Sequence, residues 1–186
     1  MQLPDAPLSP RGVAQAERLA RRLASMGIAG ILASDLPRAL ATAEALRRAT
    51  DAPLEIDPLL QERNFGDIRG TPYARLDFDL FAADYAPPAG ESWEIFHARV
   101  DRAWDLILAR AAATNGPLAV VTHGLVCRSV AARHVVLPPG EGVPERWENT
   151  SLTILDGPEP WHVRLLNCVA HLDGLAADGP PGAGPV

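Results

Sequence analysis

The chain has 186 residues, of which 47% are apolar and 22% charged, and its formal net charge is −6. Its longest basic runs are two arginine pairs, which excludes the concentrated basic face that nucleic-acid binding needs. No apolar run approaches the roughly 20 residues that span a membrane. Cys127 and Cys168 fit no metal-binding spacing, so we expect a cytoplasmic protein with reduced thiols and no metal or other cofactor.

The first half of the chain alternates predicted helices and strands. Ser9 and Pro10 are typical of the N-cap and the first residue of a helix, and apolar residues then recur at helical spacing. The elements predicted from these patterns are a helix over 10–26, a buried strand over 28–33, a helix over 36–50, a short strand over 54–56 and a short helix over 72–84.

The second half continues the alternation and closes with a hairpin. A Pro/Gly turn over 156–160 separates two apolar runs of strand length. The elements predicted here are a long helix over 92–113, a strand over 118–121, a helix over 125–136, a loop over 137–149, and strands over 151–155 and 161–165.

This alternation predicts an α/β fold, a three-layer α/β/α sandwich with a mainly parallel sheet. We expect one domain over 1–173 and, because residues 174–186 are rich in Gly, Pro, Ala and Asp, a disordered tail after it. Parallel sheets bind ligands at the carboxyl ends of their strands, so polar residues that follow strands are the candidates for chemistry.

Three such positions stand out. Arg38 lies in the first turn of a predicted helix, where a guanidinium can bind an anion together with the helix N-terminus. Glu62 lies in a loop after a strand, where partial enclosure can raise a carboxyl pKa and produce a general acid. His123 ends a buried strand, and Gly124 then lets backbone and ligand approach each other. Each position taken alone also fits an ordinary structural or surface residue.

Five short motifs, in order along the chain, together resemble the histidine phosphatase superfamily (branch 1), also called phosphoglycerate-mutase-like. The resemblance covers residues 5 to about 171. The matching segments are residues 5–12 (D-x-P-L-T-x-x-G in the family), 34–43 (S-x-L-x-R-A-x-x-T-A), 60–70 (L-x-E-x-x-F-G-x-x-x-G), 121–124 (V-[ST]-H-G) and 149–152 (N-x-S-[IL]).

The resemblance implies a metal-independent phosphomonoester hydrolase that acts through a phosphohistidine. Glu62 would protonate the leaving oxygen and then activate water. Arg38, His123 and Gly124 would bind the phosphoryl group, with Asn149 and His171 as accessory residues. The expected partner is a phosphorylated small molecule, with no nucleic acid and no membrane, and a homodimer is left open. The short stretch between Glu62 and His123 makes a true phosphoglycerate mutase the weaker expectation.

The family's nucleophilic histidine lies in an Arg-His-Gly motif at the end of its first strand, and this motif is missing from the sequence. His97, His134 and His162 are interpreted as structural or surface residues, and so is His171, although it lies nearer the expected site. Whether the chain is an enzyme therefore stays open. We expect weak or no turnover, and the alternative is a non-catalytic module that binds a phosphorylated ligand or a protein.

The missing strand would lie inside the sheet, beside the strand over 118–121. Its absence would leave two unpaired strand edges, at about 1 kcal/mol or more for each unsatisfied buried amide. Residues 118–121 nevertheless remain wholly apolar. We therefore expect a start codon assigned too far downstream or an otherwise shortened chain, with a natural pseudoenzyme as the second interpretation and a chance match to an unrelated α/β binding protein as the third.

Overall fold

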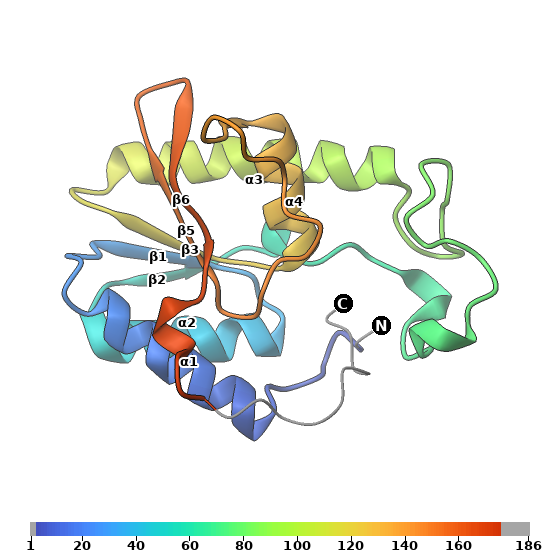
Figure 1. The fold of residues 1–186 in the computed structure, drawn as a ribbon, viewed down its shortest axis with the longest axis horizontal. Coiled ribbons are helices and arrows are strands. Elements are labelled where there is room, and N and C mark those ends of the chain that lie inside the picture. Colours follow the sequence, from blue (N-terminus) through green and yellow to red (C-terminus); the bar gives the residue numbers. More distant parts are fainter. Residues whose placement is uncertain (1–2, 176–186) are drawn as a thin grey trace.

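The structure, a computed structural model, describes residues 3–175 (Figure 1). Its α-helices are α1 (Pro10–Leu23), α2 (Pro37–Thr50), α3 (Trp93–Ala113) and α4 (Gly124–Arg133). Its strands are β1 (Gly30–Ala33), β2 (Leu54–Ile56), β3 (Leu118–Val121), β4 (Val135–Val136), β5 (Leu152–Asp156) and β6 (Trp161–Cys168). Four 3-10 helices complete the elements: η1 (Pro58–Leu60), η2 (Gly66–Ile68), η3 (Tyr73–Arg75) and η4 (Ala170–Leu172).

Serine caps begin two of the helices. Ser9 Oγ accepts the backbone N–H of Gly12 at 3.1 Å, and Pro10 occupies the first turn of α1. Ser92 Oγ accepts the N–H of Ile95 at 3.2 Å in the same way at the start of α3. Such bonds satisfy N–H groups that have no partner within the helix, which is why the chain turns helical at these positions.

The first sheet is parallel, in the order β2-β1-β3. Its central strand, β1, is buried at all four positions and alternates between two cores. Ile31 packs with α1 and α2 on one face, whereas Leu32 packs with α3 on the other. The sheet is therefore the middle layer of the predicted three-layer sandwich, with α1 and α2 below it and α3 and α4 above it in Figure 1.

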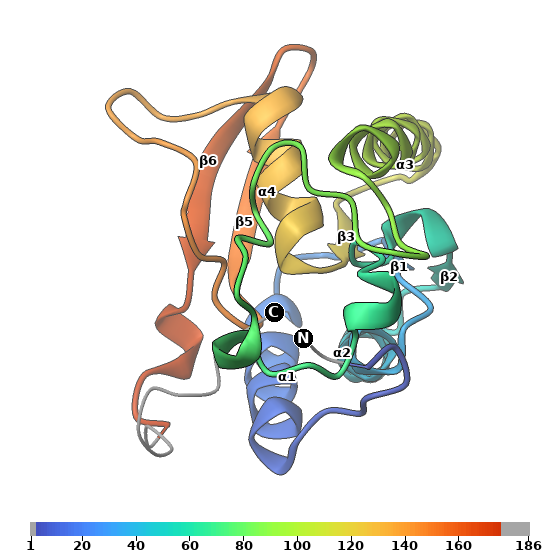
Figure 2. The same cartoon turned by 90° about the vertical axis from the view of Figure 1, so that its right-hand side faces the viewer.

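The second sheet has the order β4-β6-β5, with β4 parallel and β5 antiparallel to β6. The mainly parallel character that the sequence predicts is thus confirmed, but the strands form two sheets of three rather than one. Within residues 3–175, no strand pairs with the second edge of β3 or of β5. Figure 2 shows β5 and β6 on the far side of β3 from β1 and β2.

Several predicted boundaries are corrected by the structure. The predicted helix over 72–84 is reduced to the 3-10 turn η3, and Asp79 Oδ1 instead accepts the N–H of Phe81 at 2.8 Å, a local bond that competes with helix formation. The helix predicted over 125–136 ends at Arg133, and β4 follows. The predicted disordered tail lies outside the described residues except for 174–175. Among the described residues, no helix combines the length and apolar character needed to cross a bilayer.

Candidate active site

The carboxyl ends of β1 and β3 bring Ser34 and His123 together. Ala33 and Val121 are register partners, and the chain continues from each into the same edge of the sheet. His123 Nε2 lies 2.9 Å from Ser34 Oγ, and both side chains are buried. Burial, followed by the charges of Arg38 and Arg99, lowers the pKa of His123 to about 3. The imidazole is therefore neutral at neutral pH.

Glu62 lies in the loop after η1, against the N-terminus of α4. Its Oε1 accepts the N–H of Arg63 at 2.9 Å, and its Oε2 accepts the N–H of Leu125 at 3.3 Å. Burial raises the pKa of Glu62 more than these two N–H groups and the nearby Arg38 and Arg99 lower it. A carboxyl that keeps its proton to a higher pH suits a general acid.

Arg38 lies in the first turn of α2, as the sequence predicts. Among residues 3–175, its guanidinium is held only by long bonds, of 3.4 Å each, to the carbonyls of Leu3 and Pro4. Burial lowers the pKa of Arg38, Glu62 raises it, and Arg69 lowers it further. Arg38 is therefore within electrostatic reach of both Glu62 and Arg69, and no carboxylate of the described residues pairs with it.

Two other arginines hold the Glu62 loop in place. Arg99, on α3, donates to the carbonyls of Leu59 and Gln61 at 2.8 Å each and to that of Glu62 at 3.3 Å. The same guanidinium forms a bidentate pair with Glu91, with both contacts at 2.7 Å. One side chain, whose charge Glu91 balances, thus fixes three backbone carbonyls in η1 and the loop that follows it.

Arg63 is 2% exposed, and its charge is also satisfied inside the fold. It donates to the carbonyls of Glu91, Leu80 and Tyr85 at 3.1, 3.4 and 2.8 Å. Its guanidinium also lies 3.8 Å from the ring centroid of Trp93, a favourable cation–π contact. Together with Arg99, it forms what we call the wall of the site.

The loop after Glu62 lies unusually close to the segment before α3. Gly66 has a φ of +53°, and a Cβ there would lie 1.9 Å from the carbonyl oxygen of Pro88. The backbone of Asn64 joins the two segments: its carbonyl accepts the N–H of Glu91, and its N–H donates to the side-chain Oε2 of Glu91, both at 2.8 Å. Only glycine permits this approach, which fixes the direction of the chain that follows.

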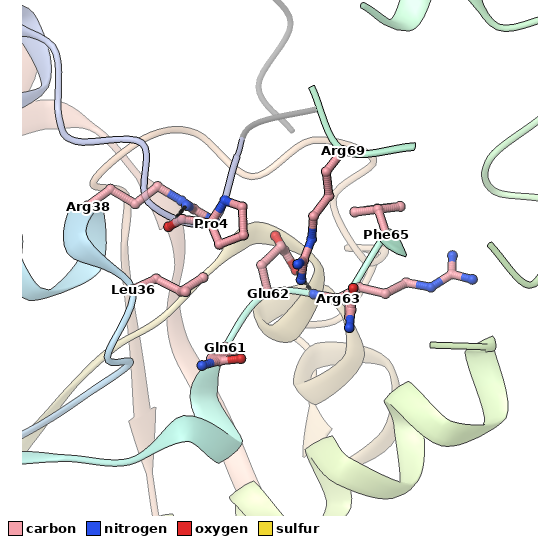
Figure 3. Close-up of a pocket in the computed structure, with 9 residues that line it drawn as sticks. Pro4, Leu36, Arg38, Gln61, Glu62, Arg63, Phe65 and Arg69 are labelled. Atoms are coloured by element: carbon pink, nitrogen blue, oxygen red, sulfur yellow. Dashed lines mark hydrogen bonds between the residues drawn. The ribbon is translucent and has the colours of Figure 1, made fainter. Parts of the chain in front are cut away.

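A cavity of about 300 Å³ opens on the other side of Glu62. It is lined by Pro4, by Leu36 and Arg38 at the start of α2, by residues 61–65, and by Arg69. Figure 3 shows Arg38 and Arg69 reaching the cavity from opposite sides, with Glu62 between them. This arrangement can bind an anion and can deliver a proton to it.

The structure brings together some of the predicted site residues and separates others. Arg38 and Glu62 share the cavity, whereas His123 and Gly124 lie behind it, next to the Leu125 N–H that Glu62 accepts. Asn149 is exposed at the approach to β5 and lines no part of the cavity.

His171 also lies apart from the cavity. Its Nδ1 lies 3.2 Å from Arg22 Nη1, and its Nε2 lies 3.5 Å from Thr150 Oγ1. Among the described residues, no cluster of His, Cys, Asp and Glu could hold a metal ion.

Sequence reasoning missed Ser34, Arg69 and Arg99 as parts of the site. Ser34 follows a buried strand just as His123 does, and that position was a usable signal. Arg99 lies within a long helix and resembles a surface arginine in the sequence. Arg69 follows a loop whose path depends on the close approach at Gly66, which no local pattern shows.

Comparison with known proteins shows the family to which the chain belongs. The family model described as "Histidine phosphatase superfamily (branch 1)" matches residues 2–169. A protein named probable phosphoglycerate mutase GpmB, from Proteus mirabilis (strain HI4320), is 30% identical over 189 residues, which cover 94% of this chain and 87% of the relative.

Among solved structures, YhfR from Bacillus stearothermophilus has a TM-score of 0.78 at 30% identity, covering 93% of this chain and 91% of that one. A mycobacterial glucosyl-3-phosphoglycerate phosphatase in complex with inorganic phosphate has a TM-score of 0.76 at 29% identity, covering 92% of each chain. An α-ribazole phosphatase from Shigella flexneri has a TM-score of 0.71 at 25% identity, covering 91% of this chain and 89% of that one.

Proposed function

Since the chain belongs to branch 1 of the histidine phosphatase superfamily, we propose that it serves the hydrolysis of phosphomonoesters, with a phosphorylated small molecule bound in the cavity beside Glu62. The observation that carries this proposal is the position of Glu62. Its carboxyl, with a raised pKa, lies between two arginines that line the same cavity. A proton donor flanked by cations is what the transfer of a phosphoryl group from an alcohol requires.

In the proposed reaction a nucleophile attacks phosphorus and the bond from phosphorus to the alcohol oxygen breaks. Glu62 gives its proton to the departing oxygen. Water then attacks the phosphoryl group and the Glu62 carboxylate takes a proton of that water, while the bond from phosphorus to the nucleophile breaks and inorganic phosphate is released. Arg38 binds the equatorial oxygens, and the neutral His123 contributes a hydrogen bond beside Gly124 at the N-terminus of α4. These arginine and backbone donors stabilise the developing charge, so the mechanism needs no metal ion.

The attacking group of this family is a histidine, as the resemblance implies, and the positions of the five histidines bear on it. His123 bonds to Ser34. The other four lie on elements that do not line the cavity, with His97 Nδ1 2.9 Å from Ser129 Oγ and His134 Nε2 2.8 Å from Asp101 Oδ1. We therefore propose that these 186 residues bind phosphate esters but hydrolyse them weakly or not at all.

One experiment tests binding and turnover together. Calorimetry with inorganic phosphate or vanadate should show binding to the wild-type chain, and the Arg38→Gln variant should bind about tenfold or more weakly. Hydrolysis of p-nitrophenyl phosphate should be weak or absent. The lack of any phosphate or vanadate binding would contradict the proposed site. Robust turnover would contradict the weak activity, and it would also contradict a purely binding role.

That binding role is the second candidate function. It is favoured by one observation, namely that Arg38 and Glu62 are in place while no second histidine of the described residues lies beside them. Binding without detectable turnover at any pH would favour it. We place either activity in the cytoplasm, where free thiols such as Cys127 and Cys168 persist in the reduced form.

A further inference from the structure

Four arginines surround Glu62, and they differ in what their guanidinium groups bind. Arg63 and Arg99 are occupied by backbone carbonyls, and Arg99 also by Glu91. Within residues 3–175, Arg38 has only two long bonds to carbonyls, and no hydrogen bond or ion pair joins the Arg69 guanidinium to an acceptor. The cavity therefore receives two arginines whose charge is left for a ligand.

Arg69 is held on a fixed base. It directly follows η2, and its N–H donates to the carbonyl of Gly66 at 3.2 Å. η2 itself is attached to the segment before α3, because Asp67 N–H donates to the carbonyl of Pro88 at 3.0 Å and the Gly66 backbone contacts the same segment. The backbone that carries Arg69 is therefore already ordered before a ligand arrives, so the loop itself does not have to be ordered on binding.

Arg38 and Arg69 approach the ligand from different sides. Arg38 comes from the start of α2, close to the strand ends that carry Ser34 and His123, and Arg69 comes from the η2 loop (Figure 3). In the proposed function, Glu62 protonates the oxygen that joins phosphorus to the alcohol. If the phosphoryl group lies toward Arg38, the alcohol part must extend past Glu62 toward Arg69.

A neutral alcohol would leave Arg69 facing the ligand without a counter-charge. The two guanidinium groups already repel each other, since Arg69 contributes to lowering the pKa of Arg38. A carboxylate or a second phosphate on the alcohol would relieve this repulsion, and both groups match the planar donor pattern of arginine. A cavity of about 300 Å³ has room for a small molecule of this kind.

From this geometry we propose that the ligand is a phosphomonoester whose alcohol part carries a second anionic group, and that Arg69 binds that second group. The inference rests on the proposed function, because it uses Glu62 to divide the cavity into a phosphoryl side and an alcohol side. It goes further by assigning the substrate class and the residue that selects it.

The test compares matched ligands on the 186-residue chain by calorimetry at low salt. The ligands are 2-phosphoglycolate, which carries a carboxylate, 1,2-ethanediol bisphosphate, which carries a second phosphate, and 2-hydroxyethyl phosphate, which carries neither. We expect at least one of the two ligands with a second anionic group to bind about tenfold more tightly than 2-hydroxyethyl phosphate. One additional charged hydrogen bond implies a difference of this size. Which of the two binds better distinguishes carboxylate from phosphate recognition.

Variants then assign the preference to a residue. Arg69→Gln should remove the tenfold difference and leave the affinity for hydroxyethyl phosphate nearly unchanged, whereas Arg38→Gln should weaken all three ligands. The matched control is Arg75→Gln, which removes the same charge from an exposed position a few residues later and should keep the preference.

The outcomes separate this inference from the proposed function. Equal affinity for the three ligands would overturn the role of Arg69 and leave the phosphomonoester site standing. An equal loss of preference in Arg75→Gln would also overturn the role of Arg69, because the preference would then depend on the net positive charge of the surface and not on a contact with Arg69. If none of the ligands binds to the wild-type chain, both the proposed function and this inference are wrong.

Discussion

The wall behind Glu62 and the cavity in front of it both contain two arginines, but among the described residues the guanidinium groups of the wall have close acceptors inside the fold and those of the cavity do not. On the wall side, Arg63 and Arg99 are saturated by carbonyls of the fold and by Glu91. On the cavity side, and within residues 3–175, Arg38 has only long contacts and the side chain of Arg69 forms no hydrogen bond. An arginine whose acceptors lie inside the fold contributes to stability, whereas one without them contributes to binding.

The largest expected effect is on the wall. Arg99→Ala leaves Glu91 as a mostly buried, unpaired charge and removes the donor for three carbonyls of the Glu62 loop. We expect the free energy of unfolding to fall by about 3–5 kcal/mol, as for other broken buried pairs. Urea denaturation measures this loss. The control is Arg110→Ala, which breaks an exposed pair with Glu55 and should cause a much smaller loss, because solvent screens exposed pairs. Equal losses in the two variants would contradict a structural wall.

On the cavity side, the corresponding change should affect binding instead. Arg38→Gln removes a charged donor, and we expect the affinity for inorganic phosphate to fall by about tenfold or more. The free energy of unfolding should change by less than about 1 kcal/mol, because the lost bonds are long. Calorimetry and urea denaturation together measure both quantities. Arg48→Gln, on the same helix but in an exposed pair with Glu17, is the control. A large loss of stability in Arg38→Gln would remove the distinction between wall and cavity.

Glu62 lies on the boundary, and its pH dependence sharpens the comparison. Burial raises its pKa, so the folded protein keeps a proton that the unfolded chain releases once the pH passes the ordinary value for glutamate. The wild type therefore loses stability as the pH rises through this window, up to the raised pKa. Glu62→Gln carries no charge and should gain stability relative to the wild type over the same window.

Urea denaturation at a series of pH values measures this relative gain. Glu44→Gln, which changes an exposed carboxylate paired with Arg47, should show no comparable trend. A constant difference between Glu62→Gln and the wild type at all pH values would mean that Glu62 is ionised in the folded protein, as an ordinary carboxylate is.

The smallest expected effect concerns the two thiols, which also differ in whether their surroundings satisfy a charge. Burial raises the pKa of Cys127 to about 12, whereas the N–H of Ala170 and the guanidinium of Arg22 lower the pKa of Cys168. Iodoacetamide should therefore alkylate Cys168 first, because the thiolate is the reactive form. Arg22→Gln should slow this reaction by about two- to threefold, since its contacts with Sγ are long, at 3.4 Å each. Mass spectrometry of the peptides follows both rates, and faster labelling of Cys127 would contradict this view.

The sequence predicts much of the fold because its strongest signals are local. The short strands over 54–56 and 118–121 and the Ser9 cap are confirmed at the predicted residues. The helix predicted over 72–84 is wrong because side-chain bonds such as that of Asp79 compete with it.

The site could be predicted only in part, for a related reason. Arg38 and Glu62 are found from their places after strands, because the topology of a parallel sheet brings strand ends together. Arg69 could not be found, since its position depends on the contact of the Gly66 loop with Pro88, far along the chain. Asn149 and His171 lie near the ends of the second sheet, and whether a second sheet forms is decided by pairing between distant strands.

The separate edges of β3 and β5 have a consequence for how the molecule opens. β1 is bonded along both edges and lies between two cores, so its amides should exchange with solvent only when the whole domain unfolds. Within residues 3–175, β3 is bonded to a neighbour along one edge only, and all four of its residues are only partly buried. The amides of β3 that point away from β1 should therefore exchange with solvent without unfolding of the whole domain. The end of this strand carries Thr122 and His123, so an edge strand of the first sheet leads directly into the site.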